Sequence, residues 1–124
     1  MTATYTYPKY AYRRPPELDG PSARRGVVVV GAGPVGLAAA IDLAQRGVPV
    51  LVLDDDDTVS VGSRAICYSK RTLEILDRLG CGEPVAGKGV GWKVGKVYQG
   101  SELAYQFDLL PESGHRRPAF VNLQ

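Results

Sequence analysis

The hydrophobic positions of this chain fall into runs that predict alternating strands and helices. Val27 to Val30 is an unbroken β-branched run, which is typical of a central parallel strand buried on both faces. Residues 37–46 are rich in helix formers with apolar side chains at helical spacing, and Gly47 is placed to end that helix. A second apolar run covers residues 48–53. Strand, helix and strand predict one βαβ unit of roughly 30 residues.

A second helix is predicted further along the chain. Residues 70–79 carry leucines on one helical face, Ser69 is a good N-cap, and Gly80 is placed to close the helix. Glycines are frequent between residues 82 and 95, and this spacing predicts a loop. The βαβ unit is therefore followed by a helix and then by irregular chain.

The last part of the chain predicts antiparallel structure. Two strand-like segments, residues 94–99 and 102–109, flank a Gly-Ser pair that suits a two-residue hairpin turn. Residues 111–118 read as a loop whose Arg116 and Arg117 are expected to be solvated, with steering of an anionic substrate as the alternative. Another strand is predicted over residues 119–123. The expected fold class is α/β: a Rossmann-like βαβ unit with an added antiparallel hairpin, forming an incomplete domain.

Residues 1–25 have no apolar periodicity. They contain four tyrosines, at positions 5, 7, 10 and 12, followed by prolines that exclude a long helix. We expect a flexible Tyr/Pro-rich leader over residues 1–25 and the folded domain over residues 26–124. The alternative is an arm whose tyrosines pack on a partner or on parts of the protein outside these 124 residues.

The net charge of +2 does not indicate a nucleic-acid-binding surface. Residues 1–25 hold five basic and two acidic residues, a net charge of +3, so 10 basic and 11 acidic residues, a net of −1, remain in residues 26–124. The predicted domain is therefore nearly neutral, and no nucleic-acid partner is expected.

The number and spacing of the cysteines, the single histidine and the hydropathy of the chain exclude further classes of protein. Cys67 and Cys81 form no CxxC pair, and a single histidine leaves too few ligands for a zinc site, so no metal is expected. A disulfide between the two thiols stays possible. The uncharged stretch from Gly26 to Ile41 is 16 residues long, shorter than the roughly 20 that span a bilayer. We therefore predict a cytoplasmic protein that does not enter a membrane.

A glycine-rich turn follows the first predicted strand and opens the first predicted helix. In such a turn the first glycine (Gly31) permits the tight bend, Gly33 lets the backbone approach a pyrophosphate, and Gly36 lets the helix pack closely on the strand. The free N–H groups at the start of the helix favour phosphate binding. The whole turn is Gly31, Ala32, Gly33, Pro34, Val35 and Gly36. The alternative is that the glycines serve only tight packing.

An acidic residue ends the second predicted strand. Asp54 lies 18 positions after Gly36, where a carboxylate can accept hydrogen bonds from the ribose hydroxyls of an adenosine. Its charge would repel a 2′-phosphate, so the site should hold FAD or NAD rather than NADP. Asp55, Asp56 and Asp57 are expected to lie in a solvated loop, because adjacent buried carboxylates would repel one another. The antiparallel hairpin, in place of a third parallel strand, favours FAD over a plain NAD-dehydrogenase arrangement.

Several segments together resemble the FAD-dependent aromatic-ring hydroxylases, the p-hydroxybenzoate hydroxylase-like flavoprotein monooxygenases. Within this group the 3-(3-hydroxyphenyl)propionate hydroxylases are the most similar. The resemblance covers residues 26–124. It is carried by the glycine turn at 31–37, the strand end at 51–54, the segment 62–67 with the run 70–80 after it, and the ending 120–124.

The resemblance implies a role for individual residues. The three glycines of the turn would hold the FAD pyrophosphate, and Asp54 stands where the family usually has Glu on the adenosine ribose. Arg64 would reach back to the pyrophosphate, and Gln124 matches a glutamine that lies near the cofactor. In such enzymes NADH or NADPH reduces the flavin, which then activates O2 to hydroxylate a phenolic substrate. The flavin carries the chemistry, so no catalytic side chain is expected here.

The resemblance also implies a longer enzyme. The family has a later Gly-Asp motif and a substrate domain, and neither occurs in these 124 residues. The expectation is an N-terminal fragment of a monooxygenase that is inactive by itself. Two alternatives stay open: a stand-alone nucleotide-binding or interaction module without catalysis, and an NAD-dependent or flavin oxidoreductase that does not use O2. Assembly into a homo-oligomer also stays possible.

Overall fold

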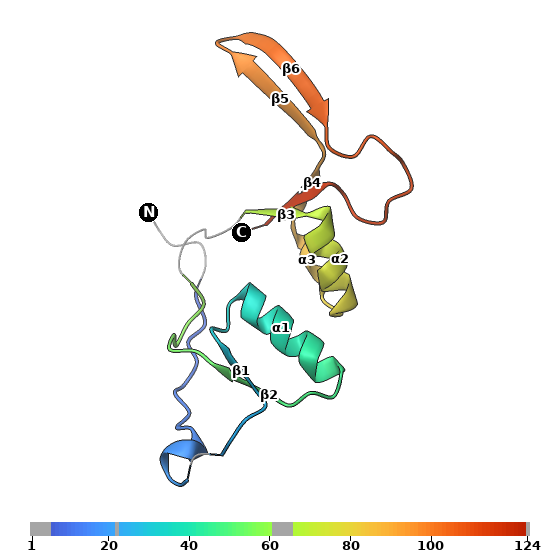
Figure 1. The fold of residues 1–124 in the computed structure, drawn as a ribbon. Helices are drawn as coiled ribbons and strands as arrows, with labels where there is room; N and C mark the ends of the chain where they lie inside the picture. Colours follow the sequence, from blue (N-terminus) through green and yellow to red (C-terminus); the bar gives the residue numbers. More distant parts are fainter. Residues whose placement is uncertain (1–5, 22, 61–65, 124) are drawn as a thin grey trace. The chain divides into compact units, whose positions relative to one another are not determined.

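The structure is a computed structural model that describes residues 6–21, 23–60 and 66–123. The chain divides into two compact units, Met1–Gly62 and Ser63–Gln124, which are described separately (Figure 1). The predicted division at residue 25, between leader and domain, stays a prediction. No helix among the described residues is long and apolar enough to cross a membrane.

The first unit contains the predicted βαβ arrangement. Strand β1 (Val27–Val30) pairs in parallel with β2 (Val50–Leu53), and helix α1 (Pro34–Gln45) connects them. The predicted helix thus begins three residues earlier than its apolar pattern indicated, because Pro34 at the first helical position has the φ that a helix requires. Gly47, with φ +74°, ends the helix as predicted.

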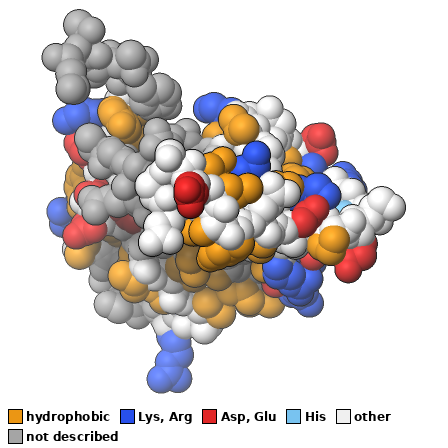
Figure 2. Space-filling model, turned by 90° about the horizontal axis from the view of Figure 1, so that it is seen from above, with side chains coloured by type: hydrophobic (Ala, Val, Ile, Leu, Met, Phe, Trp, Pro, Cys, Tyr) orange, Lys and Arg blue, Asp and Glu red, His pale blue; other side chains and the backbone are white. Residues whose placement is uncertain are grey.

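Strand β1 is not buried on both faces, which corrects that expectation. Its residues alternate between half-buried and exposed: Val27 and Val29 are half-buried, whereas Val28 and Val30 are 46% and 83% exposed. The reason is that helix α1 packs on one face of a two-stranded sheet, so the other face stays open. Hydrophobic side chains are accordingly visible on the molecular surface in Figure 2.

The leader is not wholly detached from the first unit. It contains a short 3-10 helix, η1 (Pro16–Leu18), with an ion pair between Arg14 and Asp19 beside it. Further back, residues 8–10 lie against residues 57–58, the chain that follows β2 (Figure 1).

The second unit is built on a three-stranded antiparallel sheet with the order β3-β7-β4. Its strands are β3 (Cys67–Ser69), β7 (Phe120–Asn122) and β4 (Val90–Trp92). Helices α2 (Lys70–Arg78) and α3 (Gly82–Lys88) pack on each other. The fully buried side chains are Leu73 of α2 and Val121 of β7, which form the centre of this unit's core.

Helix α2 has the ends that the sequence predicts. The Ser69 hydroxyl accepts a hydrogen bond from the Thr72 N–H at 3.3 Å, and this bond caps the first turn. Gly80 follows the helix with φ +85°, which matches the predicted closing glycine.

The segment after Gly80 is not a loop, contrary to expectation. It forms α3 and β4, and two of its glycines, Gly82 and Gly89, stand where a neighbouring group lies too close for a side chain. A Cβ at Gly82 would overlap the Asp77 carboxylate, one at Gly89 would overlap Val121, and one at Gly91 would contact Pro118. These glycines permit close tertiary packing, whereas the sequence pattern alone is also typical of turns.

The predicted hairpin is present. Strands β5 (Val94–Gln99) and β6 (Glu102–Asp108) pair antiparallel around Gly100, whose φ of +60° suits the glycine-first turn. The register of the β5–β6 pairing shifts between Val97 and Tyr98. The hairpin extends away from β4 in Figure 1.

Arg117 is buried, which corrects its expected place in a solvated loop. Only 5% of the residue is exposed. Its guanidinium donates to both carboxylate oxygens of Asp77, with 2.7 Å from Nε to Oδ2, and to Glu83 at 2.8 Å. This ion-pair cluster joins the chain before β7 to α2 and α3, and the hydrogen bonds from Arg117 lower the pKa of Asp77.

Replacement of the core leucine tests the second unit. Leu73→Ala should lower the free energy of unfolding of the chain by about 2–5 kcal/mol, because a fully buried side chain is lost and a cavity remains. Urea unfolding followed by circular dichroism measures the change. Leu103→Ala, at a position that is 51% exposed, serves as the matched control and should change it much less.

The Asp77–Arg117 pair predicts a pH dependence of stability. Because the pKa of Asp77 is lower in the folded than in the unfolded chain, its stabilising effect is present above the unfolded value and is lost as the pH falls through the folded one. Asp77→Asn should therefore lower the urea midpoint at pH 7, and its deficit should shrink as the pH falls toward 3. Glu112 is an exposed acid in the loop that carries Arg117, and Glu112→Gln should show no such trend. An equal trend in both variants would contradict the assignment to Asp77.

Candidate functional site

The glycine-rich turn joins the end of β1 to the start of α1. The Gly31 N–H donates to the Leu53 carbonyl oxygen at 2.7 Å, which continues the pairing of β1 with β2 beyond their last residues. Gly31 has φ +99°, a value that favours glycine. Gly33 is the N-cap of α1, and its carbonyl accepts the first helical hydrogen bond, from the Leu37 N–H at 2.9 Å. The chain therefore turns from strand to helix within three residues.

Helix α1 approaches the turn so closely that Gly36 can have no side chain. A Cβ there would fall on the carbonyl oxygen of Gly31 and would lie 3.2 Å from Cγ1 of Val29. The N–H groups of Val35 and Gly36 lie in the first helical turn, where the helix itself offers no acceptor. They and the positive end of the helix dipole are suited to an anion.

Gly33 differs from Gly36, because no residue that the structure describes occupies the space beside it. No described heavy atom lies within 4 Å of the position that a Cβ would take, apart from its chain neighbours. Its φ of −71° is accessible to any residue. Neither backbone geometry nor packing within the chain requires a glycine at this position.

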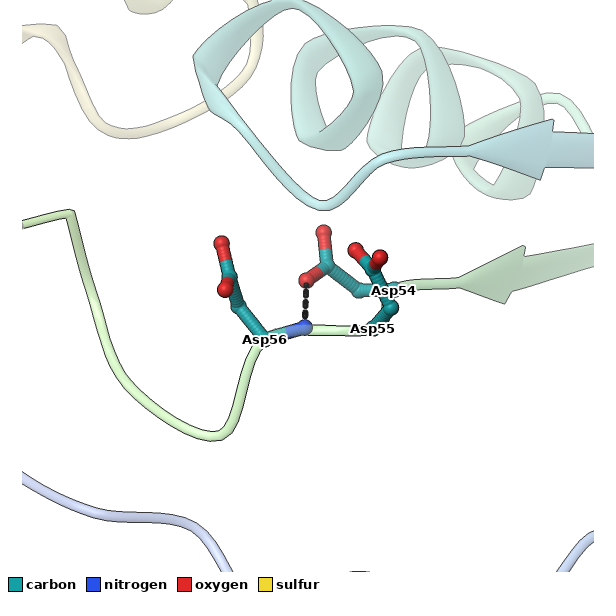
Figure 3. A group of neighbouring side chains, drawn as sticks. All are labelled: Asp54, Asp55 and Asp56. Carbon is teal, nitrogen blue, oxygen red and sulfur yellow. Dashed lines mark hydrogen bonds between the residues drawn. The ribbon is translucent and has the colours of Figure 1, made fainter.

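Asp54 connects the turn to the end of β2. Its Oδ2 accepts a hydrogen bond from the Ala32 N–H, and its Oδ1 accepts one from the Asp56 N–H at 2.9 Å (Figure 3). These bonds, the one from Ala32 foremost, lower the pKa of Asp54 below its ordinary value, so the group is an anion at neutral pH. The carboxylate holds the glycine turn and the following acidic loop together.

The carboxylates of Asp54, Asp55 and Asp56 form an exposed acidic cluster. Their oxygen atoms lie within 4.8 Å of one another, a spacing that could hold a cation. All three residues are exposed, as the predicted solvated loop requires for Asp55 and Asp56, and exposed acidic groups commonly lie this close without an ion. These carboxylates are part of the exposed surface of the loop after β2.

An open pocket of about 380 Å³ lies at the carboxyl ends of the two strands. Its lining comes from both strand ends: Val30, Gly31, Leu53, Asp54 and Asp55. This is the edge of a parallel sheet at which α/β proteins commonly bind ligands. The end of β1 with Gly31 and the end of β2 with Asp54 and Asp55 therefore line one concave surface.

The structure brings seven of the nine predicted site residues together. They are the six residues of the turn, 31–36, and Asp54. Arg64 and Gln124 lie outside the described residues.

Sequence reasoning missed the contact between the leader and the loop after β2. Thr58 and residues 8–10 are 50 positions apart, and no periodicity or motif connects them. The only available signal was opposite charge, since the leader is basic and residues 54–57 are all aspartate.

A known protein family and several individual proteins are similar to this chain. The family described as "FAD binding domain" matches residues 24–122. A 6-methylpretetramide 4-monooxygenase of Streptomyces rimosus is 41% identical over 75 residues, which are 60% of this chain and 13% of the relative. A para-nitrophenol 4-monooxygenase of a Pseudomonas species is 43% identical over 65 residues, or 52% of this chain and 16% of the relative.

Solved structures agree with these matches. The p-nitrophenol 4-monooxygenase PnpA of Pseudomonas putida superposes with a TM-score of 0.68 at 35% identity, over 80% of this chain and 26% of PnpA. The flavin-dependent monooxygenase PieE, in complex with FAD and substrate, superposes with a TM-score of 0.64 at 24% identity, over 84% of this chain and 20% of PieE, and shows the same fold.

This chain spans less than a third of the length of each of these relatives. The family match nevertheless covers both units of the structure, and it confirms the predicted α/β fold class and FAD as the cofactor. The chain belongs to the FAD binding domain family, and its relatives are flavin-dependent monooxygenases.

Proposed function

We propose that this chain is the adenosine- and pyrophosphate-binding part of an FAD-dependent monooxygenase. The whole enzyme uses NADH or NADPH and O2 to hydroxylate small phenolic substrates, and these 124 residues alone are inactive. The relatives support this proposal, because the names of two of them state that they oxidise p-nitrophenol. In this proposal the protein works in the cytoplasm and has no nucleic-acid partner.

The single observation that carries the proposal is the unexplained glycine at position 33. The chain leaves the space beside Gly33 open, and its backbone conformation accepts any residue. A ligand that must approach the backbone explains the absence of a side chain there. The position lies between Gly31 and the first turn of α1, where phosphate oxygens would meet free N–H groups.

The residues of the site would hold FAD by its adenosine end. The N–H groups of Val35 and Gly36 donate to the pyrophosphate, and Asp54 accepts from the ribose hydroxyls. Arg64, placed by the family resemblance, adds a planar cationic donor on the pyrophosphate. When bound, FAD supplies hydride acceptance from the nicotinamide and activation of O2. The contribution of this chain is to bind and orient the cofactor.

Titration calorimetry with three ligands tests the proposed site. FAD and ADP should bind the chain weakly at most, because it can enclose only the adenosine end, and with similar affinity, since both carry the adenosine and the pyrophosphate. FMN should not bind. Equal binding of FMN and ADP would point to a different site. Failure to bind either FAD or ADP would falsify the proposal for this chain.

Substitution of Gly33 should separate cofactor binding from folding. Gly33→Val places a side chain where the pyrophosphate approaches, so the affinity for ADP should fall at least about tenfold. Because valine is a poorer N-cap than glycine, the free energy of unfolding should also fall, by about 1 kcal/mol. Gly26→Val is the matched control, because Gly26 also has open space around it and precedes β1 outside the turn. An equal loss of ADP affinity in both variants would contradict a specific role of Gly33.

The charge of Asp54 should exclude a 2′-phosphate. The unchanged chain should bind ADP more tightly than 2′-phospho-ADP, the same nucleotide with a phosphate on its ribose 2′-oxygen, because the Asp54 anion repels the added phosphate. Asp54→Asn should narrow that difference while weakening ADP itself, since a charged acceptor is lost. Competition binding with the two nucleotides measures both effects, and Asp57→Asn controls for the general charge of the loop. If the 2′-phosphate makes no difference to the unchanged chain, Asp54 does not face the ribose.

The reaction itself is tested on the protein that carries this domain. Oxidation of NADH or NADPH should depend on a phenolic substrate, consume O2 and yield a hydroxylated product identified by mass spectrometry. Substrate-independent oxidation without hydroxylated product would favour a flavin reductase or dehydrogenase instead.

A further inference from the structure

Three residues of the leader lie along the end of the acidic loop. The Tyr10 N–H donates to the Asp57 carbonyl oxygen at 2.7 Å, and the Thr58 hydroxyl donates to the Pro8 carbonyl oxygen at 3.0 Å. Between these bonds Lys9 and Thr58 form an antiparallel bridge. Residues 8–10 thus add a short strand-like segment to residues 57–58, and we refer to residues 8–10 as the strap.

The strap contacts the far end of the loop that begins at Asp54. Asp54 is followed by Asp55 and Asp56, and the strap takes hold at Asp57 and Thr58. The loop is therefore fixed at both ends. At its start Asp54 accepts from the Ala32 and Asp56 N–H groups, and at its end the backbone pairs with the strap.

Charge favours this contact, but hydrogen bonding defines it. Nζ of Lys9 lies 3.6 Å from Oδ2 of Asp57, and the leader carries a net charge of +3 against four consecutive aspartates. The Lys9 and Asp57 side chains are both mostly exposed, so the ion pair itself contributes little. The directional contacts are the two hydrogen bonds, which fix the loop in one register against the strap.

The strap lies outside the part of the chain that matches the family. That match begins at residue 24, whereas the strap ends at residue 10. The contact is therefore a feature of this chain added to the FAD-binding domain, and it is made at the loop that carries Asp54.

We propose that the strap is a positioning element that preorganises the loop 54–58 and thereby strengthens binding of the adenosine end of FAD. This inference rests on the proposed function. An exposed loop that is already ordered loses less conformational freedom when a ligand binds to it, and the difference appears as affinity. The Tyr10 N–H and the Thr58 hydroxyl are the groups that transmit this effect.

Two substitutions remove the strap contacts from opposite sides. Tyr10→Pro deletes the N–H that donates to Asp57, and Thr58→Val deletes the hydroxyl that donates to Pro8. Tyr12→Pro is the matched control, because it places the same residue in the same leader two positions beyond the strap. Hydrogen exchange of the Asp56 and Asp57 amides reports the order of the loop, and calorimetry with ADP reports the affinity.

The inference predicts faster exchange of both amides and about fivefold weaker ADP binding in Tyr10→Pro and Thr58→Val, with no change in Tyr12→Pro. If ADP affinity and amide exchange are equal in all variants, the proposed role of the strap is overturned, and the proposed function stays intact. Equal losses in Tyr10→Pro and Tyr12→Pro, with Thr58→Val unchanged, also overturn it, because the effect then belongs to the leader's general conformation. Absence of ADP binding by the unchanged chain overturns the proposed function, and the adenosine role of the strap with it.

Discussion

The close approach of α1 to the end of β1 is the constraint on which the candidate site depends. A side chain at Gly36 would occupy the place of the Gly31 carbonyl oxygen, so the helix can lie where it does only without one. This approach places the first turn of α1 at the carboxyl ends of β1 and β2. The same strand ends carry Gly31, bonded to Leu53, and Asp54, bonded to Ala32. One missing Cβ thus allows helix dipole, open turn and carboxylate to converge.

The elements that the sequence predicted correctly are those whose causes are local. The β-branched run of β1, the Ser69 cap of α2 and the positive-φ glycines at 47, 80 and 100 each act within a few residues of themselves. The seven described site residues belong to this group, because a strand, a turn and a helix in succession place them together. Their spacing in the sequence was therefore sufficient to predict that they lie together, and their role in cofactor binding stays a prediction.

The features that the sequence did not predict have distant causes. Gly89 resembles a turn glycine, but the neighbour that excludes a side chain there is Val121, far along the chain in β7. Arg117 resembles a solvated loop residue until Asp77, 40 positions away, accepts its hydrogen bonds. Burial of β1 on both faces was expected from composition alone, whereas the number of strands and helices that cover it decides how much is exposed.

Asp54 organises the turn and, in the proposed function, also accepts from a bound nucleotide. A carboxylate has about four lone-pair positions, and in this structure two of them accept from the N–H groups of Ala32 and Asp56. The other two stay available for the ribose hydroxyls. The Asp side chain is one methylene shorter than the Glu that the resembling family usually has, and this short reach suits an acceptor that must stay beside the backbone of the turn. The loop that Asp54 begins then needs its own support further along the chain. The leader provides this support by pairing with residues 57–58.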